Sequence, residues 1–180
     1  IVRDPRNVIT SLKNHYEMDD ETALKWMTTE NKFIYDVRNI KQDGYSDFQF
    51  ISSWGTNYKS WKIQKQIPVK IIRYEDLLKE TYTVFKEILE FINKILNTKE
   101  KINKDKLKNS VRTTLFDVLK NDEKKNGFTE AVPSKNNDEK IPFFNLGPEN
   151  NWKNILNDNQ KSKLSEIFKS NLKELGYEVG

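Results

Sequence analysis

One stretch constrains the fold more than any other, because it combines the composition of a buried strand with an immediate turn into a helix. Pro68 to Tyr74 is short, rich in β-branched residues, and bounded by Pro68 and by Glu75-Asp76, which is typical of a strand. An apolar repeat at helical spacing follows, through Val84, Phe85, Ile88, Leu89, Ile92 and Leu96. Strand, short acidic turn and helix in this order predict an α/β fold with a parallel sheet.

The start of the chain repeats this pattern in shorter form. Ile1-Val2 has the character of the end of a buried strand, and Asp4-Pro5 ends it, with Pro5 suited to the first turn of a helix. A chain that opens inside such a motif favours a fragment. We therefore expect residues 1–180 to be one domain or most of one, with part of its machinery before residue 1.

Apolar spacing and capping residues predict the remaining elements. A helix from Asp19-Asp20 is expected to carry Leu24, Met27, Ile34 and Arg38, and a loop is expected over Lys41 to Ser46. Further expectations are a helix with Trp54, Tyr58 and Trp61, a short helix plus loop over Lys99 to Ser110, an apolar piece over Val111 to Leu119, a long polar loop over Asn121 to Lys140, and a last helix capped by Asn157 or Asp158 and ended by Gly176.

The composition argues against several classes of site. With no Cys and a single His, disulfides and Cys- or His-based metal sites are not expected, so no metal cofactor is predicted. The lack of Cys favours a reducing compartment and a cytoplasmic location. The net charge of +4 suits an anionic ligand, but the lysines are scattered, so nucleic acid is not an expected partner. No apolar run approaches the roughly 20 residues of a membrane span.

Arg3 and Ser11 are the first candidates for chemistry. Arg3 follows a strand end and precedes a helix N-terminus, where free N–H groups favour an anion. Its planar guanidinium suits phosphate oxygens, and the Ser11 hydroxyl could add a donor. The ordinary alternative is that Arg3 pairs with Asp4 or another carboxylate and that Ser11 is a surface residue.

Two later segments carry similar ambiguity. Tyr74 leaves the carboxyl end of a predicted strand, where α/β sheets bind ligands, although it could simply pack under the next helix. Phe143 to Lys153 contains Gly147, which would let backbone approach a phosphate closely. The alternative for this segment is a rigid turn before the last helix.

Taken together, these blocks resemble the C-terminal portion of sulfotransferases that use 3′-phosphoadenosine-5′-phosphosulfate (PAPS). The Arg3…Ser11 pair with Pro5 between them, Tyr74-Glu75-Asp76-Leu77, and Asn145 to Lys153 occur in the order of the family's Arg…Ser, Tyr-Glu-Asp-Leu and Arg-Lys-Gly-x-x-Gly-Asp-Trp-Lys blocks. Weaker similarities are Trp54 to Trp61 and Thr114-Leu115-Phe116, which resembles the family's Thr-Ser-Phe segment. The resemblance implies an incomplete P-loop NTPase-like sulfotransferase fold, helix-rich in this chain, with residues 1–180 as the C-terminal part of a single domain.

The resemblance also implies a cofactor and roles. PAPS would donate a sulfuryl group to a hydroxyl or amine of a small-molecule or carbohydrate acceptor. Arg3 and Ser11 would hold the 3′-phosphate, together with Asn145 and the Gly147 N–H. Tyr74, Thr114 and Phe116 would lie on the adenine side. That phosphate does not react, so its contacts would position the cofactor. His15, the single His, is expected to be structural.

This sequence departs from the family pattern at several points. Asn145-Leu146 replaces Arg-Lys, so two cationic contacts are lost, for which Lys140 or Lys153 could compensate. Asn150-Asn151 replaces Gly-Asp, and the dimerisation segment of the family is not recognisable in Asn154 to Leu156. The family's 5′-phosphosulfate loop and catalytic base precede the Arg…Ser block, so we expect the isolated chain to be inactive. A nucleotide kinase-like P-loop enzyme and a degenerate, non-catalytic nucleotide-binding module are the alternatives.

Overall fold

The helix α1 (Pro5–Tyr16) lies at the centre of the arrangement. The structure, a computed structural model, describes residues 1–34 and 48–179. The Asp4 side chain accepts a hydrogen bond from the Arg6 N–H, and Pro5 occupies the first turn, where its missing N–H costs little. The helix ends after Tyr16 because Glu17 adopts a left-handed conformation with φ of 47°. The predicted helix start at Pro5 is confirmed.

The two predicted strand segments meet, but they form one bridge instead of a sheet. The Val2 N–H donates to the Ile72 carbonyl at 2.8 Å, and the Tyr74 N–H donates to the Val2 carbonyl at 2.7 Å. The pairing is parallel, as predicted. The predicted strand over residues 68–74 is nevertheless wrong in extent, because Val2 is its one strand partner among the described residues. The described sheet is antiparallel, formed by β1 (Phe33–Ile34) and β2 (Gln49–Phe50).

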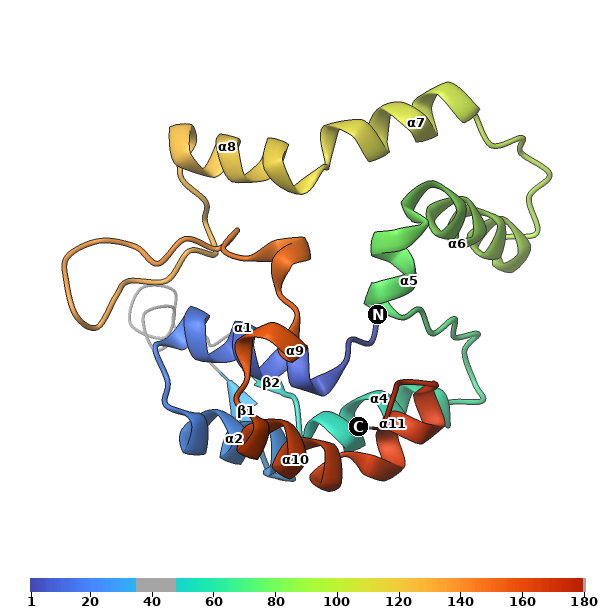
Figure 1. Cartoon of the computed structure of the whole chain (residues 1–180). Helices are drawn as coiled ribbons and strands as arrows, with labels where there is room; N and C mark the ends of the chain where they lie inside the picture. Colours follow the sequence, from blue (N-terminus) through green and yellow to red (C-terminus); the bar gives the residue numbers. More distant parts are fainter. Residues whose placement is uncertain (35–47, 180) are drawn as a thin grey trace.

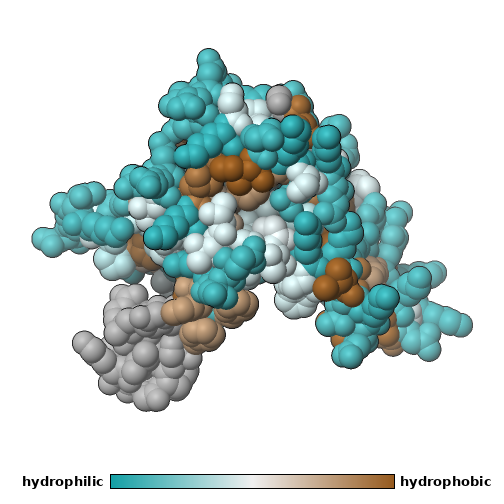
Figure 2. All heavy atoms as spheres, turned by 90° about the horizontal axis from the view of Figure 1, so that it is seen from below, coloured by the Kyte–Doolittle hydropathy of each residue, from teal (hydrophilic) through white to brown (hydrophobic). Residues whose placement is uncertain are grey.

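The hydrophobic core lies between α1 and the helices in the lower half of Figure 1. These are α2 (Asp20–Thr28), α4 (Trp54–Lys62), α9 (Trp152–Ile155), α10 (Asp158–Ile167) and α11 (Lys169–Leu175). The core members are Ile9, Ala23, Met27, Trp152, Leu156, Leu164, Phe168 and Leu172. Seen from below, the molecule is largely hydrophilic, with apolar residues in separate patches (Figure 2), as amphipathic helices around a core require.

The upper half of Figure 1 is an arm formed by α5 (Tyr74–Lys79), α6 (Thr81–Ile95), α7 (Lys104–Thr113) and α8 (Phe116–Asn126). After α8 the chain returns toward α1 through residues 127–151. This return includes the 3₁₀ turn η1 (Gly147–Glu149) and leads into α9. It brings residues 143–150 against α1, although the two segments are far apart in sequence.

Several predicted boundaries need correction. The helix from Asp20 ends at Thr28, and Ile34 belongs to β1, where it pairs with Gln49. The expected position of Arg38 and the expected loop over residues 41–46 lie outside the described residues. The predicted loop over residues 121–140 is shortened because α8 continues to Asn126, and α7 extends the short helix expected before it.

The predicted last helix is two helices, since α10 and α11 are separated at Phe168. Its start is confirmed: the Asn157 side chain accepts from the Gln160 N–H, while the Gln160 side chain accepts from the Asn157 N–H. This reciprocal pair is a capping box. Its end is confirmed too, because Gly176 takes the left-handed cap with φ of 71°. Within the described residues, no helix has the length and apolar character needed to cross a bilayer.

Candidate anion-binding site

A cavity of about 450 Å³ lies between α1, the start of α5, the start of α8 and the returning segment 143–150. Its walls bring together predicted site residues that are up to 144 positions apart, from Arg3 to Gly147. Six of the seven predicted residues line it, namely Arg3, Ser11, Tyr74, Phe116, Asn145 and Gly147. Thr114 does not line this cavity, and its hydroxyl donates to the Ser110 carbonyl at 2.8 Å.

Arg3 lines the cavity and has no carboxylate partner among the described residues. Its Nη1 is 3.4 Å from the Ser11 Oγ, and its guanidinium carbon lies 4.3 Å from the centre of the Tyr74 ring. Its Nε is buried and has no hydrogen-bond partner in the described structure. A buried donor without a partner costs about 1–3 kcal/mol, so the guanidinium of Arg3 keeps unused hydrogen-bonding capacity.

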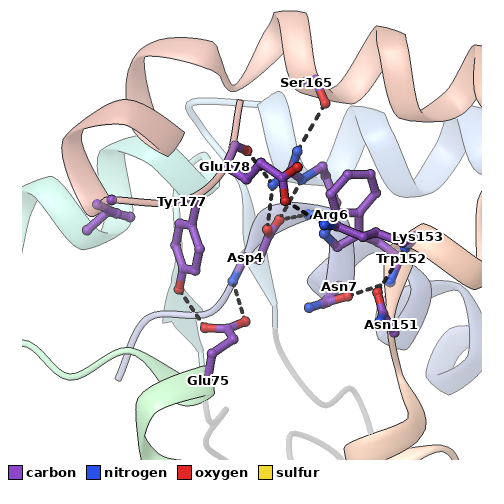
Figure 3. A network of polar contacts seen from close by, with 12 residues as sticks. Asp4, Arg6, Asn7, Glu75, Asn151, Trp152, Lys153, Ser165, Tyr177 and Glu178 are labelled. Carbon is purple, nitrogen blue, oxygen red and sulfur yellow. Dashed lines mark hydrogen bonds and ion pairs between the residues drawn. The ribbon is translucent and has the colours of Figure 1, made fainter. Parts of the chain in front are cut away.

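The expected alternative pairing of Arg3 with Asp4 is not formed, because another arginine takes that carboxylate. Arg6 is fully buried and bonds to Asp4 through both carboxylate oxygens, with the ion pair at 2.7 Å (Figure 3). The same guanidinium donates to the Ser165 hydroxyl and the Glu178 carbonyl. Arg6 therefore occupies Asp4 fully and leaves Arg3 directed to the cavity.

The charge of the lining favours an anion. Among the described lining residues, Arg3 is the single basic residue besides His15, and no residue is acidic. His15 also lines the cavity, but burial lowers the pKa of its imidazole, while the charge of Glu130 acts in the opposite direction. The His15 ring packs edge-to-face on Tyr16 and Phe143, with centroid separations of 4.6 and 5.7 Å. Arg3 is thus the permanent charge of this site.

Gly147 is held in a conformation and a contact that a larger residue would not tolerate. Its φ is +52°, and a Cβ placed on it would lie 2.2 Å from a ring carbon of Phe116. The Phe116 ring therefore packs directly on the Gly147 backbone. Nearby, the Lys120 ammonium donates to the Asn145 carbonyl at 2.8 Å and ties α8 to the same segment.

The two lysines expected to compensate for Asn145-Leu146 do not line this cavity. The Lys153 ammonium pairs with Glu178 (Figure 3). Lys140 lines a separate cavity of about 280 Å³, on the α8 side of Phe144 and Asn145. The structure instead brings two residues to the site that the sequence analysis did not assign, Asn150 in the lining and Lys120 behind Asn145. The sequence feature that could have pointed to Asn150 is that it stands where the family pattern has Gly.

Residues 127–146 are fixed to the helices by two carboxylates. Glu17, at the end of α1, accepts hydrogen bonds from the Ser134 hydroxyl at 2.8 Å and from the Lys135 N–H. Glu123 on α8 accepts from the Phe143 and Phe144 N–H groups at 2.7 and 2.9 Å. These bonds hold the aromatic wall of the cavity in place.

Acidification should release the contact at Glu17. The Lys135 N–H, followed by the Ser134 hydroxyl, lowers the pKa of Glu17 from its ordinary value of 4.5. Because the folded pKa is depressed, the stabilisation is present above pH 4.5 and is lost as the pH falls through the folded value. Hydrogen exchange should show the Lys135 amide losing its protection from exchange as the pH falls below 4.5. Glu17→Ala should abolish the protection at every pH, whereas Glu139→Ala should leave its pH dependence unchanged.

Within the described residues, no group of three or more His, Asp or Glu side chains could hold a metal ion. The cavity lining offers one guanidinium, several hydroxyl and amide groups, and aromatic rings. This combination suits a phosphorylated ligand with a flat ring system.

Two comparisons relate this chain to known proteins. The protein-family model described as "Sulfotransferase domain" matches residues 1–176. A solved structure described as "Crystal structure of mouse sulfotransferase SULT7A1 complexed with PAP" matches 95% of this chain at 18% sequence identity, with a TM-score of 0.59. The chain spans 56% of the length of that structure. At this identity the match shows the fold, so the predicted α/β, helix-rich architecture is confirmed at that level.

Proposed function

The chain belongs to the family of proteins built on a sulfotransferase domain, and from this premise we propose that it binds the 3′-phosphate and adenine side of PAPS. In this proposal the protein transfers the sulfuryl group of PAPS to a hydroxyl or amine of a small-molecule or carbohydrate acceptor. The P-loop-like character of the fold belongs to the same proposal. The mouse sulfotransferase was solved as a complex with PAP, and we extend that ligand to this chain on the chemistry of its own cavity.

The single observation that carries the proposal is the state of Arg3. It is the one permanent cation in a cavity whose described lining contains no carboxylate, and its buried Nε has no partner in the described structure. A guanidinium so placed can present two parallel N–H donors to a phosphate monoester. Ser11, which lies further along α1, adds a hydroxyl beside it at 3.4 Å.

The aromatic part of the cavity suits the adenine ring. Tyr74 and Phe116 line it from α5 and α8, and the Phe116 ring is fixed against Gly147 and lies edge-to-face with Phe144 at 6.1 Å. Fixed aromatic faces bind a flat base without reorganisation. Thr114 precedes α8 by two positions, and its role on the adenine side stays part of the proposal.

The chemistry supplied by bound PAPS is an activated sulfuryl group. The residues of this cavity hold the part of the nucleotide that does not react. Arg3 and Ser11 fix the 3′-phosphate, and the aromatic side chains fix the base, so that the nucleotide has one orientation. Correct orientation of reactants contributes a large share of enzymatic rate enhancement.

Replacing Arg3 by Ala should weaken binding of 3′,5′-adenosine bisphosphate about tenfold to a hundredfold, because a charge-assisted bond contributes roughly 1.5–3 kcal/mol. Isothermal titration calorimetry on the full chain measures this directly. Arg112→Ala is the matched control, since Arg112 is exposed on α7 and its described bond is to Asn109.

Two results would contradict the proposal. Equal affinity of the Arg3→Ala variant and the parent chain would remove Arg3 from the site. Absence of any binding by the parent chain would favour a degenerate module that lost its affinity with Asn145-Leu146. Transfer of labelled sulfate from PAPS to a panel of hydroxyl and amine acceptors, with the longest form of the protein that can be expressed, tests the activity itself.

A further inference from the structure

Asn150 is a buried amide that connects α1 to the segment carrying Gly147. The residue is 5% exposed. Its Nδ2 donates to the Asn7 carbonyl at 3.0 Å and to the Ser11 Oγ at 2.7 Å, while its Oδ1 accepts from the Thr10 hydroxyl at 2.5 Å. All of these hydrogen bonds are directed at one short stretch of α1.

The orientation of this amide follows from its partners. The Asn7 carbonyl can only accept a hydrogen bond, so the amide nitrogen of Asn150, and not its oxygen, must face it. The remaining N–H of that nitrogen then points at the Ser11 Oγ. Consequently Ser11 accepts from Asn150 and cannot donate to it.

The same reasoning determines where the Ser11 proton points. A hydroxyl has one proton and two lone pairs. Asn150 supplies a donor to one lone pair, and Arg3 Nη1 faces the oxygen from another side at 3.4 Å. The carbonyl of Asn7, four residues earlier, is the usual intrahelical acceptor for a serine hydroxyl, but the Asn150 amide already donates to it. The Ser11 proton is left for a partner in the cavity.

We propose that Asn150 is a positioning residue that turns the hydroxyl proton of Ser11 into the cavity, toward an oxygen of the 3′-phosphate. The inference rests on the proposed function for the identity of the anion. Asn150 stands where the family pattern has Gly, and in the same segment Asn145-Leu146 stands where that pattern has two cations. This chain therefore lacks the two cationic side chains of the family pattern, and in the proposal it relies on one neutral donor, the Ser11 hydroxyl, whose direction is fixed.

A preset donor is stronger than a free one because the ligand does not have to order it. Outside the site a serine hydroxyl rotates among several acceptors, and that freedom is lost on binding. In this structure donors face both lone pairs before a ligand arrives. The expected consequence is that changing Asn150 to Gly, the family residue, weakens binding rather than improving it.

The experiment is a double-mutant cycle with two nucleotides on the full chain. Asn150→Gly and Ser11→Ala should each weaken 3′,5′-adenosine bisphosphate binding about tenfold, and both should leave binding of adenosine 5′-monophosphate, which lacks the 3′-phosphate, within about twofold. The double variant should bind no more weakly than Ser11→Ala alone. Asn151→Ala is the matched control, because its side chain caps α9 through the Lys153 N–H and should lower stability without changing either affinity.

Each other outcome overturns the inference in a recognisable way. Unchanged bisphosphate affinity in Asn150→Gly, additive losses in the double variant, or equal losses for both nucleotides would reduce Asn150 to a packing role. If the parent chain fails to bind the bisphosphate, or if Arg3→Ala leaves binding unchanged, the proposed function fails and the inference fails with it.

Discussion

Gly147→Ala is expected to destabilise the protein by about 2–5 kcal/mol and to remove measurable binding of 3′,5′-adenosine bisphosphate, because two costs combine. A left-handed φ, here +52°, costs a non-glycine residue roughly 1–2 kcal/mol. The new methyl carbon would lie 2.2 Å from the Phe116 ring, and overpacking of this kind adds about 1–3 kcal/mol. Relief of the contact moves either the Phe116 ring or the Gly147 backbone, and both form the cavity wall. Urea unfolding and calorimetry measure the two effects.

A matched control separates the conformational cost from the clash. Gly127 also has a positive φ, +74°, but nothing lies within 4 Å of a Cβ placed there. Gly127→Ala should therefore destabilise the chain while leaving nucleotide affinity unchanged. In the Gly147→Ala background, Phe116→Ala should recover part of the lost stability because it removes the ring. Full nucleotide affinity in the Gly147→Ala single variant would show that this wall does not form the site.

The sequence analysis predicted the helix ends correctly where the features that set them are local. The start of α1 at Pro5 after Asp4 and the glycine cap at Gly176 each depend on a few neighbouring residues. The resemblance in three separate blocks then predicted that Arg3, Ser11, Tyr74 and Gly147 share one site, and all four line one cavity. Their roles toward a nucleotide stay a prediction.

What the sequence did not predict depends on pairing partners far along the chain. Arg3 and Arg6 are close in sequence and chemically identical, and the sequence favoured Arg3–Asp4 as the alternative ion pair. The structure pairs Asp4 with Arg6 because Ser165 and the Glu178 carbonyl, from the C-terminal end of the chain, accept further hydrogen bonds from the same guanidinium. The predicted strand over residues 68–74 was wrong in extent for a similar reason. A strand needs a hydrogen-bonded neighbour, and among the described residues this segment pairs with Val2 alone.

The two arginines differ in how many of their hydrogen-bond donors have partners. Each of the three guanidinium nitrogens of Arg6 has a hydrogen-bond partner, and its guanidinium carbon lies 3.8 Å from the centre of the Trp152 ring. These contacts fix the N-terminus of α1 against the C-terminal helices. Arg3 is left incompletely satisfied on the cavity side of the same turn. A fully buried, well-partnered arginine beside one with an unused donor fits the proposal that the second charge serves ligand binding.

The other large effect should come from Arg6. Removal of one partner from a buried ion pair costs about 3–5 kcal/mol, because the other charge is left desolvated. In Arg6→Met, Asp4 would stay 4% exposed with its guanidinium partner gone, while Ser165 and Trp152 would lose their contacts (Figure 3). The free energy of unfolding from a urea titration should fall by that amount.

The double variant Asp4→Asn/Arg6→Met tests whether the loss comes from the unpaired charge. It should recover a substantial part of the stability, since replacing both members of a buried pair is often close to neutral. Glu166→Gln is the control on an exposed pair, with Lys169 at 3.0 Å and side chains 49% and 74% exposed, and it should change stability by less than about 1 kcal/mol. An Arg6→Met variant as stable as the control would show that the buried pair does not hold α1 in place, and the placement of Arg3 would then need another cause.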